Sequence, residues 1–257
     1  MTSMVTDKVE HASVAPDRRR PVASAWPRHE ADELAAAMRV LESGRVNSLI
    51  HGDECRAFEQ EFAAFIDMPH AVSVSNGTVA LELALRALEV GPGDEVILPA
   101  RSFFASASCI VAVGAEPVFA DILPETQNID PASVERLVTP RTRAVICVHL
   151  AGLPCDMDAL TALCEKRGLF LIEDCAQAHG ARFRGRAVGS FGDASAFSFC
   201  TDKIMQPPNP CSAAPSRMVW AAIPLSKLNE LAMPVSPSIT MYAEGRSPSG
   251  GPGQSFK

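Results

Sequence analysis

The chain lacks any long uninterrupted apolar run. Its longest apolar stretch, around residues 105–113, is too short to span a bilayer and ends at Gly114. Near the N-terminus, Asp7, Glu10 and His11 stand where a secretory signal would need an apolar segment, so no signal peptide is expected. These two absences predict a cytoplasmic protein with no membrane partner.

The sequence is also short of positive charge. Its 23 Lys and Arg residues are outnumbered by 30 Asp and Glu residues, which gives a net charge of −7 at pH 7. Nucleic acids and anionic membrane surfaces favour proteins with clustered Lys and Arg. The basic run at residues 18–20 is short, so no nucleic-acid partner is expected.

None of the eight cysteines belongs to a CxxC pair. The chain has 257 residues and is 47% hydrophobic, so it can bury a core without a disulfide framework, and free thiols are expected. Cys147, His149, Cys155 and Cys164 could ligate a metal, but their spacing matches no common structural zinc site. No metal site is therefore predicted.

Short apolar runs alternate with helical patterns through the middle of the chain. The apolar runs are at residues 71–75, 95–99, 117–121, 144–150, 169–174 and 194–199. The helical patterns are at residues 30–43, 58–65, 78–88, 104–113, 131–138 and 156–167. This alternation predicts an α/β fold of three layers, in which helices cover both faces of a mostly parallel sheet.

The two ends of the chain differ from this pattern. Residues 1–25 are polar and contain proline, so a flexible arm is expected there. Residues 26–205 are expected to form one large domain. Residues 206–257 hold 9 of the 20 prolines together with 8 serines, which predicts a divergent and poorly ordered tail.

Parallel α/β sheets bind ligands at the carboxyl ends of their strands. After the first expected strand, Ser75-Asn76-Gly77-Thr78 opens a helix whose free N–H groups and dipole could seat a phosphate. An ordinary helix cap by Asn76 or Thr78 is the simpler interpretation. After the second strand, Phe103 could stack on a flat cofactor ring or belong to the core.

Two further strand ends carry ionisable groups. The fifth expected strand closes on Glu173 and Asp174, and strand alternation puts only one of these carboxylates on the ligand side. That carboxylate suits a cationic partner such as a protonated pyridine nitrogen, although Asp174 could instead cap the segment that follows. Ser198 ends the sixth strand and could bind a phosphate. Lys203 could form an imine with an aldehyde cofactor or remain a solvated surface charge.

The conjunction of these strand ends favours pyridoxal phosphate (PLP). The segments Glu-Asp-Cys-Ala-Gln-Ala-His-Gly-Ala at 173–181 and Phe-Ser-Phe-x-x-x-Lys at 197–203 resemble the DegT/DnrJ/EryC1/StrS family of sugar aminotransferases, which has the fold of aspartate aminotransferase. The resemblance extends from about Trp26 to Met205. It implies pyridoxal 5′-phosphate as cofactor and transfer of an amino group, usually from glutamate, to a nucleotide-linked keto-sugar. It also implies a homodimer.

The same resemblance assigns roles to individual residues. Lys203 would carry the cofactor as a Schiff base and shuttle protons, while Asp174 would pair with the pyridine nitrogen. Gln177 would hydrogen-bond near the phenolic oxygen, and Phe103 would stack on the ring. The phosphate would be held by Gly77, Thr78 and Ser198. Some relatives have His instead of the lysine and act as dehydratases, and Lys203 argues against that branch.

The sequence departs from the family pattern after Met205. A Gly-rich stretch, a strand and a small C-terminal domain would follow in the family, whereas Gln206-Pro207-Pro208-Asn209-Pro210 follows here. This predicts a truncated or frameshifted chain without the small domain. Besides an aminotransferase, the chain could be a non-catalytic remnant or a regulatory partner of an intact homologue. A nucleotide-binding module is disfavoured, because the phosphate turn lacks the GxGxxG and Walker patterns.

Overall fold

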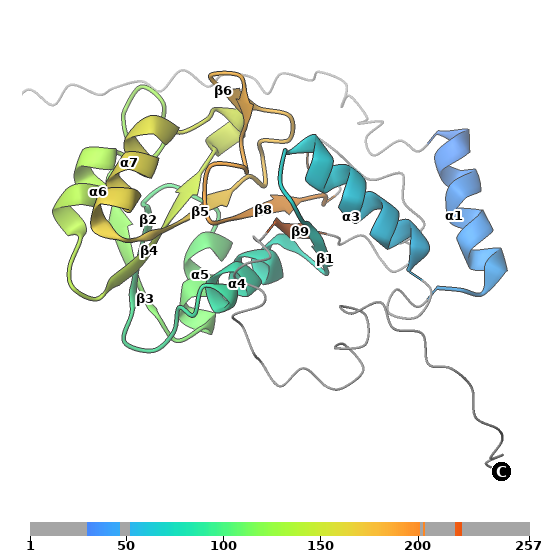
Figure 1. Ribbon diagram of the computed structural model, residues 1–257, viewed down its shortest axis with the longest axis horizontal. Helices are drawn as coiled ribbons and strands as arrows, with labels where there is room; N and C mark the ends of the chain where they lie inside the picture. Colours follow the sequence, from blue (N-terminus) through green and yellow to red (C-terminus); the bar gives the residue numbers. More distant parts are fainter. Residues whose placement is uncertain (1–29, 47–51, 201–202, 204–218, 223–257) are drawn as a thin grey trace, which may run out of the picture.

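The computed structural model describes residues 30–46, 52–200, 203 and 219–222 (Figure 1). The predicted arm and the rest of the predicted tail lie outside the described residues. The helices are α1 (Ala31–Ser43), α3 (Asp53–Phe65), α4 (Gly77–Ala87), α5 (Ala105–Ala112), α6 (Pro131–Leu137), η1 (Leu150–Gly152) and α7 (Met157–Arg167). The strands are β1 (Val72–Val74), β2 (Glu95–Pro99), β3 (Glu116–Ala120), β4 (Thr142–Val148), β5 (Phe170–Asp174), β6 (Arg182–Phe183), β7 (Arg186–Ala187), β8 (Ala194–Ser198) and β9 (Val219–Ala222).

One seven-stranded sheet organises the molecule, in the order β1-β9-β8-β5-β4-β2-β3. The pairs β2–β3, β2–β4, β4–β5 and β5–β8 are parallel, and β9 pairs antiparallel with both β1 and β8. The prediction of a mostly parallel α/β sheet is therefore confirmed. Each of the six predicted strands is present, with its bounds within two residues of those expected.

Strand β9 was not predicted. It lies in the segment that was expected to be poorly ordered, yet it is inserted between β1 and β8 and hydrogen-bonds to both. The expectation of disorder is wrong for these four residues. A run this short has no distinctive strand pattern, and its position depends on ladder partners that are distant in the sequence.

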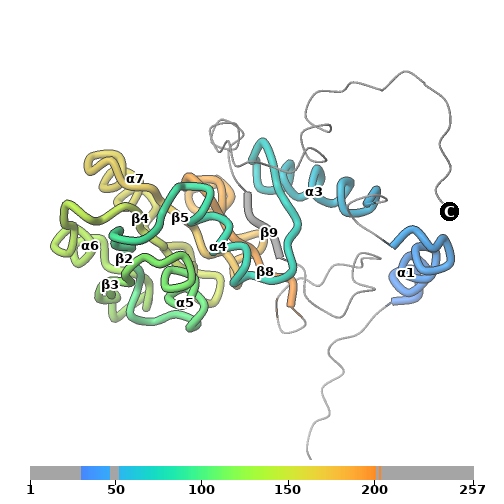
Figure 2. The backbone as a smooth tube through the Cα atoms, turned by 90° about the horizontal axis from the view of Figure 1, so that it is seen from below, coloured from blue at the N-terminus to red at the C-terminus, as the bar shows by residue number. Residues whose placement is uncertain are grey.

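The strands contribute alternate side chains to two separate cores. Val96, Ala144 and Ile172 pack with α4 and α5, whereas their chain neighbours Ile97, Val145 and Leu171 pack with α6 and α7. Because successive side chains of a strand point to opposite faces, these two clusters lie on opposite sides of the sheet. The separation of α6 and α7 from α4 and α5 can be followed in Figure 2.

A third core lies where α3 meets the end of β8. The ring of Phe62 contacts those of Phe197 and Phe199 edge-on, at centroid distances of 4.9 and 5.3 Å. Helix α3 therefore supports the strand that leads toward Lys203. Helix α1 lies apart from the sheet (Figure 2) and buries none of its residues in the described part of the chain.

The described cysteines are mostly free thiols. Six of them are free, but Cys55 is disulfide-bonded, so the expectation of free thiols throughout is wrong at this position. Within the described ranges, no helix has both the length and the apolar character needed to cross a bilayer.

Candidate functional site

A pocket of about 680 Å³ lies at the carboxyl ends of the parallel strands. The residues proposed from the sequence all line it: Gly77, Thr78, Phe103, Asp174, Gln177, Ser198 and Lys203. They follow or end β1, β2, β5 and β8, four strands that are far apart in the chain. The sheet brings them together because strands that run in the same direction end at the same edge.

Three register partners on adjacent strands form a row along the pocket. Val148 on β4, Asp174 on β5 and Ala196 on β8 are paired in the ladder, and all three line the cavity. Paired residues project to the same face of a sheet. Asp174 is the single acidic residue among the described residues that line the pocket, so the site presents one carboxyl group from an otherwise apolar row.

The carboxylate of Asp174 is only 6% exposed. Its Oδ1 accepts a hydrogen bond from the Ala176 N–H (3.1 Å), and its Oδ2 accepts one from the Ser106 hydroxyl (2.9 Å). Burial raises the pKa of Asp174 above its ordinary range, and these hydrogen bonds and the charge of Lys203 oppose the rise. Asp174 thus caps the following segment, as the alternative interpretation held, and also faces the pocket.

The turn after β1 is both a helix cap and a wall of the pocket. Asn76 Oδ1 accepts a hydrogen bond from the Val79 N–H at 3.0 Å, which is the ordinary capping contact. Gly77 and Thr78 lie in the first turn of α4, where N–H groups have no acceptor within the helix. Ser198 ends β8, which is separated from β1 by β9 in the sheet, and it lines the same pocket. The chemistry of this wall suits an anion.

Phe103 and Gln177 lie at the pocket with side chains available to a ligand. Phe103 is 65% exposed, so the interpretation of this residue as part of the core is wrong. Gln177 Oε1 accepts a hydrogen bond from the Ala151 N–H at 2.7 Å. Because a backbone N–H can only donate, this contact assigns Oε1 as the acceptor and leaves Nε2 as the donor group of Gln177.

Lys203 borders the same pocket as Asp174. Its backbone N–H donates to the Cys200 carbonyl at 2.9 Å. Its charge also reaches His179, whose pKa is lowered to about 4 by burial and, to a smaller extent, by Lys203. In the described part of the chain, neither ring nitrogen of His179 has a hydrogen-bond partner. His179 is therefore a neutral buried imidazole close to the candidate lysine.

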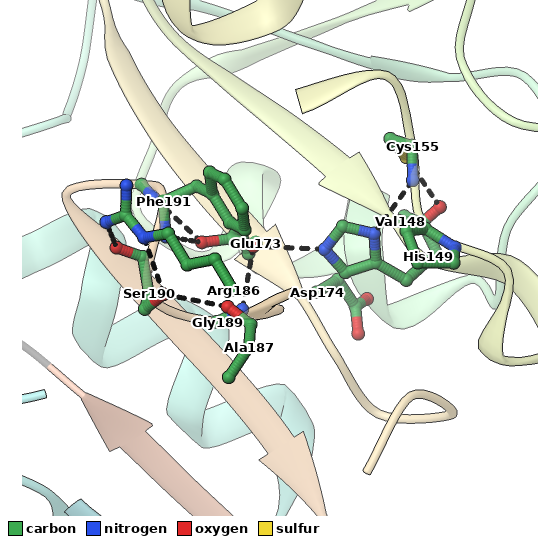
Figure 3. Close-up of polar contacts among 12 residues, drawn as sticks. Val148, His149, Cys155, Glu173, Asp174, Arg186, Ala187, Gly189, Ser190 and Phe191 are labelled. Carbon is green, nitrogen blue, oxygen red and sulfur yellow. Dashed lines mark hydrogen bonds and ion pairs between the residues drawn. The ribbon is translucent and has the colours of Figure 1, made fainter. Parts of the chain in front are cut away.

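Potential metal-ligand atoms of His149, Glu173 and Cys175 lie within 4.8 Å of one another. This set shares only His149 with the residues considered from the sequence. Figure 3 shows His149 and Glu173 facing each other. His149 Nε2 lies 3.1 Å from Glu173 Oε2, and His149 Nδ1 accepts from the Cys155 N–H at 3.1 Å. Both ring nitrogens therefore have protein partners, and no metal is needed to satisfy them.

Two contacts of the site had no signal in the sequence. Ser106 reaches Asp174 from a helix 68 positions away, and a serine inside an apolar helix is unremarkable. The partnership of His149 with Glu173 requires β4 and β5 to be neighbours, which follows from the order of strands in the sheet. This contact could have been proposed only by first predicting that β4 and β5 are parallel neighbours.

Comparison with protein-family models shows which family this chain belongs to. Residues 27–207 match the DegT/DnrJ/EryC1/StrS aminotransferase family. The chain belongs to this family. The match begins just after the expected start at Trp26 and extends two residues beyond Met205, and it contains both of the segments that carry the resemblance in the sequence.

Individual relatives are similar over the same region. The dTDP-3-amino-3,4,6-trideoxy-alpha-D-glucose transaminase of Streptomyces venezuelae is 48% identical over 70% of this chain and 47% of its own length. The L-glutamine:2-deoxy-scyllo-inosose aminotransferase of Streptoalloteichus tenebrarius is 48% identical over 74% of this chain and 46% of its own. The chain thus spans about half the length of these curated relatives.

Solved structures show the same relationship. A sugar aminotransferase of Streptococcus pneumoniae, solved in its PLP form, superimposes with a TM-score of 0.72 at 32% identity. The superposition covers 87% of this chain and 56% of that one. The α/β architecture described above thus matches about half of that aminotransferase structure.

Proposed function

We propose that this chain binds PLP in the pocket and provides the large domain of an aminotransferase for nucleotide-linked keto-sugars. The observation that carries the proposal is the convergence of Lys203 and Asp174 on one cavity. A lysine amine can hold an aldehyde cofactor, and a buried carboxylate can hold a cationic ring nitrogen. Because the chain spans about half of its curated relatives, transfer to the sugar and a homodimeric assembly are also part of the proposal.

The residues of the pocket fit PLP group by group. Gly77, Thr78 and Ser198 offer a helix N-terminus and a hydroxyl to the phosphate. The exposed ring of Phe103 offers a face for the pyridine ring. Burial disfavours the ionised form of Asp174, and a pyridinium nitrogen beside it would restore that form.

Bound PLP supplies an electron sink for amino transfer. In the proposed mechanism, a carboxylate oxygen of Asp174 would accept a hydrogen bond from the protonated ring nitrogen and keep it protonated. Gln177 Nε2 would donate to the phenolic oxygen, since Oε1 is already engaged by the Ala151 N–H. Lys203 Nζ would hold the cofactor and would be the group that moves protons at the substrate carbon.

The test begins with the purified chain and PLP. We expect a visible absorbance band, and after borohydride reduction a covalent adduct that peptide mapping places on Lys203. Lys203→Ala should lose the band, whereas the matched variant Lys166→Ala, which removes an exposed lysine of α7, should keep it. A chain that shows no band and no adduct would favour the non-catalytic remnant or regulatory partner instead.

A second step asks for the amino donor. Loss of the visible band on adding glutamate would support the proposed donor, and loss with glutamine alone would replace it. Glutamine is the donor in the name of the S. tenebrarius relative. Product formation would then be followed with dTDP- and UDP-linked keto-sugars. A cytoplasmic location stays a prediction from the sequence.

A further inference from the structure

Glu173 points away from the pocket, on the other face of β5, and its side chain is fully buried. Its Oε1 accepts from the backbone N–H groups of Phe191 and Gly192, each at 2.7 Å. Its Oε2 accepts from the Gly189 N–H at 2.7 Å and lies 3.1 Å from His149 Nε2 (Figure 3). An unpartnered buried carboxylate is very costly. Here four donors match the four acceptor positions of an ionised carboxylate.

The contacts of His149 define its protonation. The backbone N–H of Cys155 can only donate, so His149 Nδ1 must be the unprotonated acceptor of that bond. Burial lowers the pKa of His149, but Cys175, Cys155 and Glu173 raise it well above its ordinary value. The Cys155 N–H nevertheless occupies Nδ1, so in this geometry the ring is neutral, carries its proton on Nε2 and donates it to Glu173 Oε2. The two neighbouring thiols differ: Cys155 Sγ donates to the Val148 carbonyl at 3.2 Å although hydrogen bonds with Cys147 and His149 lower its pKa to about 6, whereas burial raises the pKa of Cys175 to about 12.

This network holds together three segments that carry pocket residues. The turn at 189–192 leads directly into β8, which ends at Ser198. His149 follows β4, and its backbone N–H donates to the Asp174 carbonyl at 3.1 Å. Glu173 accepts hydrogen bonds from the turn at 189–192 and from His149, and it precedes Asp174 on β5. Movement of Glu173 would therefore shift the pocket residues on either side of it.

We propose that Glu173 is a positioning residue for the cofactor pocket: its ionised carboxylate holds His149 as the neutral Nε2–H tautomer and fixes β4, β5 and β8 so that Asp174 and Ser198 face one ligand. The role of these residues toward PLP rests on the proposed function. The protonation of His149 does not, because it follows from contacts within the protein alone.

The first measurement is therefore made on the full chain without cofactor. Histidine side chains are labelled with ¹⁵N, and long-range ¹H–¹⁵N correlations give the protonation of each ring. The signals of His149 are assigned by their loss in His149→Asn. We expect a neutral Nε2–H ring with no titration between pH 5.5 and 8. A cationic ring or a proton on Nδ1 would overturn the proposal, whatever happens to the variants.

The second measurement uses Glu173→Gln, which keeps the shape of the side chain. A glutamine has one oxygen and one NH₂ group, so it must point donors at backbone N–H groups or at His149. We expect the His149 spectrum to change and PLP to bind at least about tenfold more weakly in an absorbance titration. Wild-type affinity with an unchanged His149 spectrum would contradict the proposal.

Ser195→Ala is the matched control. Ser195 is the register partner of Glu173 on β8 and is fully buried, and its hydroxyl has no hydrogen-bond partner in the described part of the chain. Removing this hydroxyl should leave the His149 spectrum and PLP affinity unchanged. If the wild-type chain fails to bind PLP at all, the proposed function fails, while the tautomer measurement still decides the protonation of His149.

Discussion

The hydroxyl of Ser106 on α5 lies 2.9 Å from Asp174 Oδ2 at the end of β5. Ser106 is fully buried, and its oxygen also lies 2.6 Å from that of Ser102 at the pocket wall. The contact joins a covering helix to the sheet at the point where the carboxylate faces the cavity. Of the described partners of this carboxylate, Ser106 is the one that reaches it from another layer of the fold.

Removing this hydroxyl should weaken the pocket for a cationic ligand. In Ser106→Ala, Asp174 Oδ2 loses a donor that lowers the carboxyl pKa, so its ionised form becomes less favourable. We expect about tenfold weaker PLP binding, measured by absorbance titration. Ser108→Ala on the same helix is the control, because the Ser108 hydroxyl donates to the Ala105 carbonyl of its own helix and makes no hydrogen bond to Asp174 in the described part of the chain. Equal affinity of Ser106→Ala and wild type would contradict this role.

Asp174 should reduce the stability of the chain without cofactor at neutral pH. Its pKa is raised in the folded state, mainly by burial, so the stability that it contributes is present at low pH and is lost as pH rises through the folded pKa. Asp174→Asn removes the stability lost when Asp174 ionises, so it should stabilise the cofactor-free chain at pH 7 by roughly 1 kcal/mol. Urea unfolding at pH 4 and 7 tests this, since the gain should shrink at pH 4. The same substitution should abolish PLP binding.

His179 should make the fold sensitive to acid. Its pKa is lowered to about 4, chiefly by burial, so its contribution is present above pH 6.5 and is lost as pH falls toward 4. Lowering the pH from 7 to 5 should therefore reduce the free energy of unfolding by about 2 kcal/mol through His179 alone. His179→Phe should lack that part of the pH slope. Any packing penalty of the larger ring is independent of pH. Parallel plots of unfolding free energy against pH for wild type and His179→Phe would therefore show that His179 does not cause the acid sensitivity.

Gly189 should tolerate no side chain. An added Cβ would lie 2.5 Å from Phe197 Cζ, and the residue has φ +90°. Gly93 has a similar φ of +95° with nothing within 4 Å of such a Cβ, so Gly93→Ala isolates the backbone cost of about 1 kcal/mol. We expect Gly189→Ala to lose roughly 1–3 kcal/mol more, because the ring of Phe197 must move. Equal unfolding midpoints would count against the clash.

Much of the fold was predictable because its signals are local. The apolar runs at β2, β4 and β5 are continuous, as in strands buried on both faces, and Gly44 and Gly168 end helices in the left-handed conformation. The site residues were predictable for a related reason. A parallel sheet collects its strand ends at one edge, so position along the chain pointed to the segments around Phe103, Glu173-Asp174 and Ser198, and the family resemblance then selected Phe103 and Asp174.

The remaining features depend on distant partners. The sequence indicated that Glu173 and Asp174 face opposite ways, but only the sheet shows that Asp174 joins Val148 and Ala196 at the pocket. The pairing of β9 with β1 and β8, the reach of Ser106 to Asp174 and the protonation of His149 each require a second segment far away in the chain. The sequence by itself therefore determined the principal helices and strands and the chemical groups that stand at their ends, because propensity and periodicity are local, whereas short elements such as β9 were not predictable from it. The tertiary structure alone decided which groups meet, because hydrogen bonds and burial depend on neighbours in space.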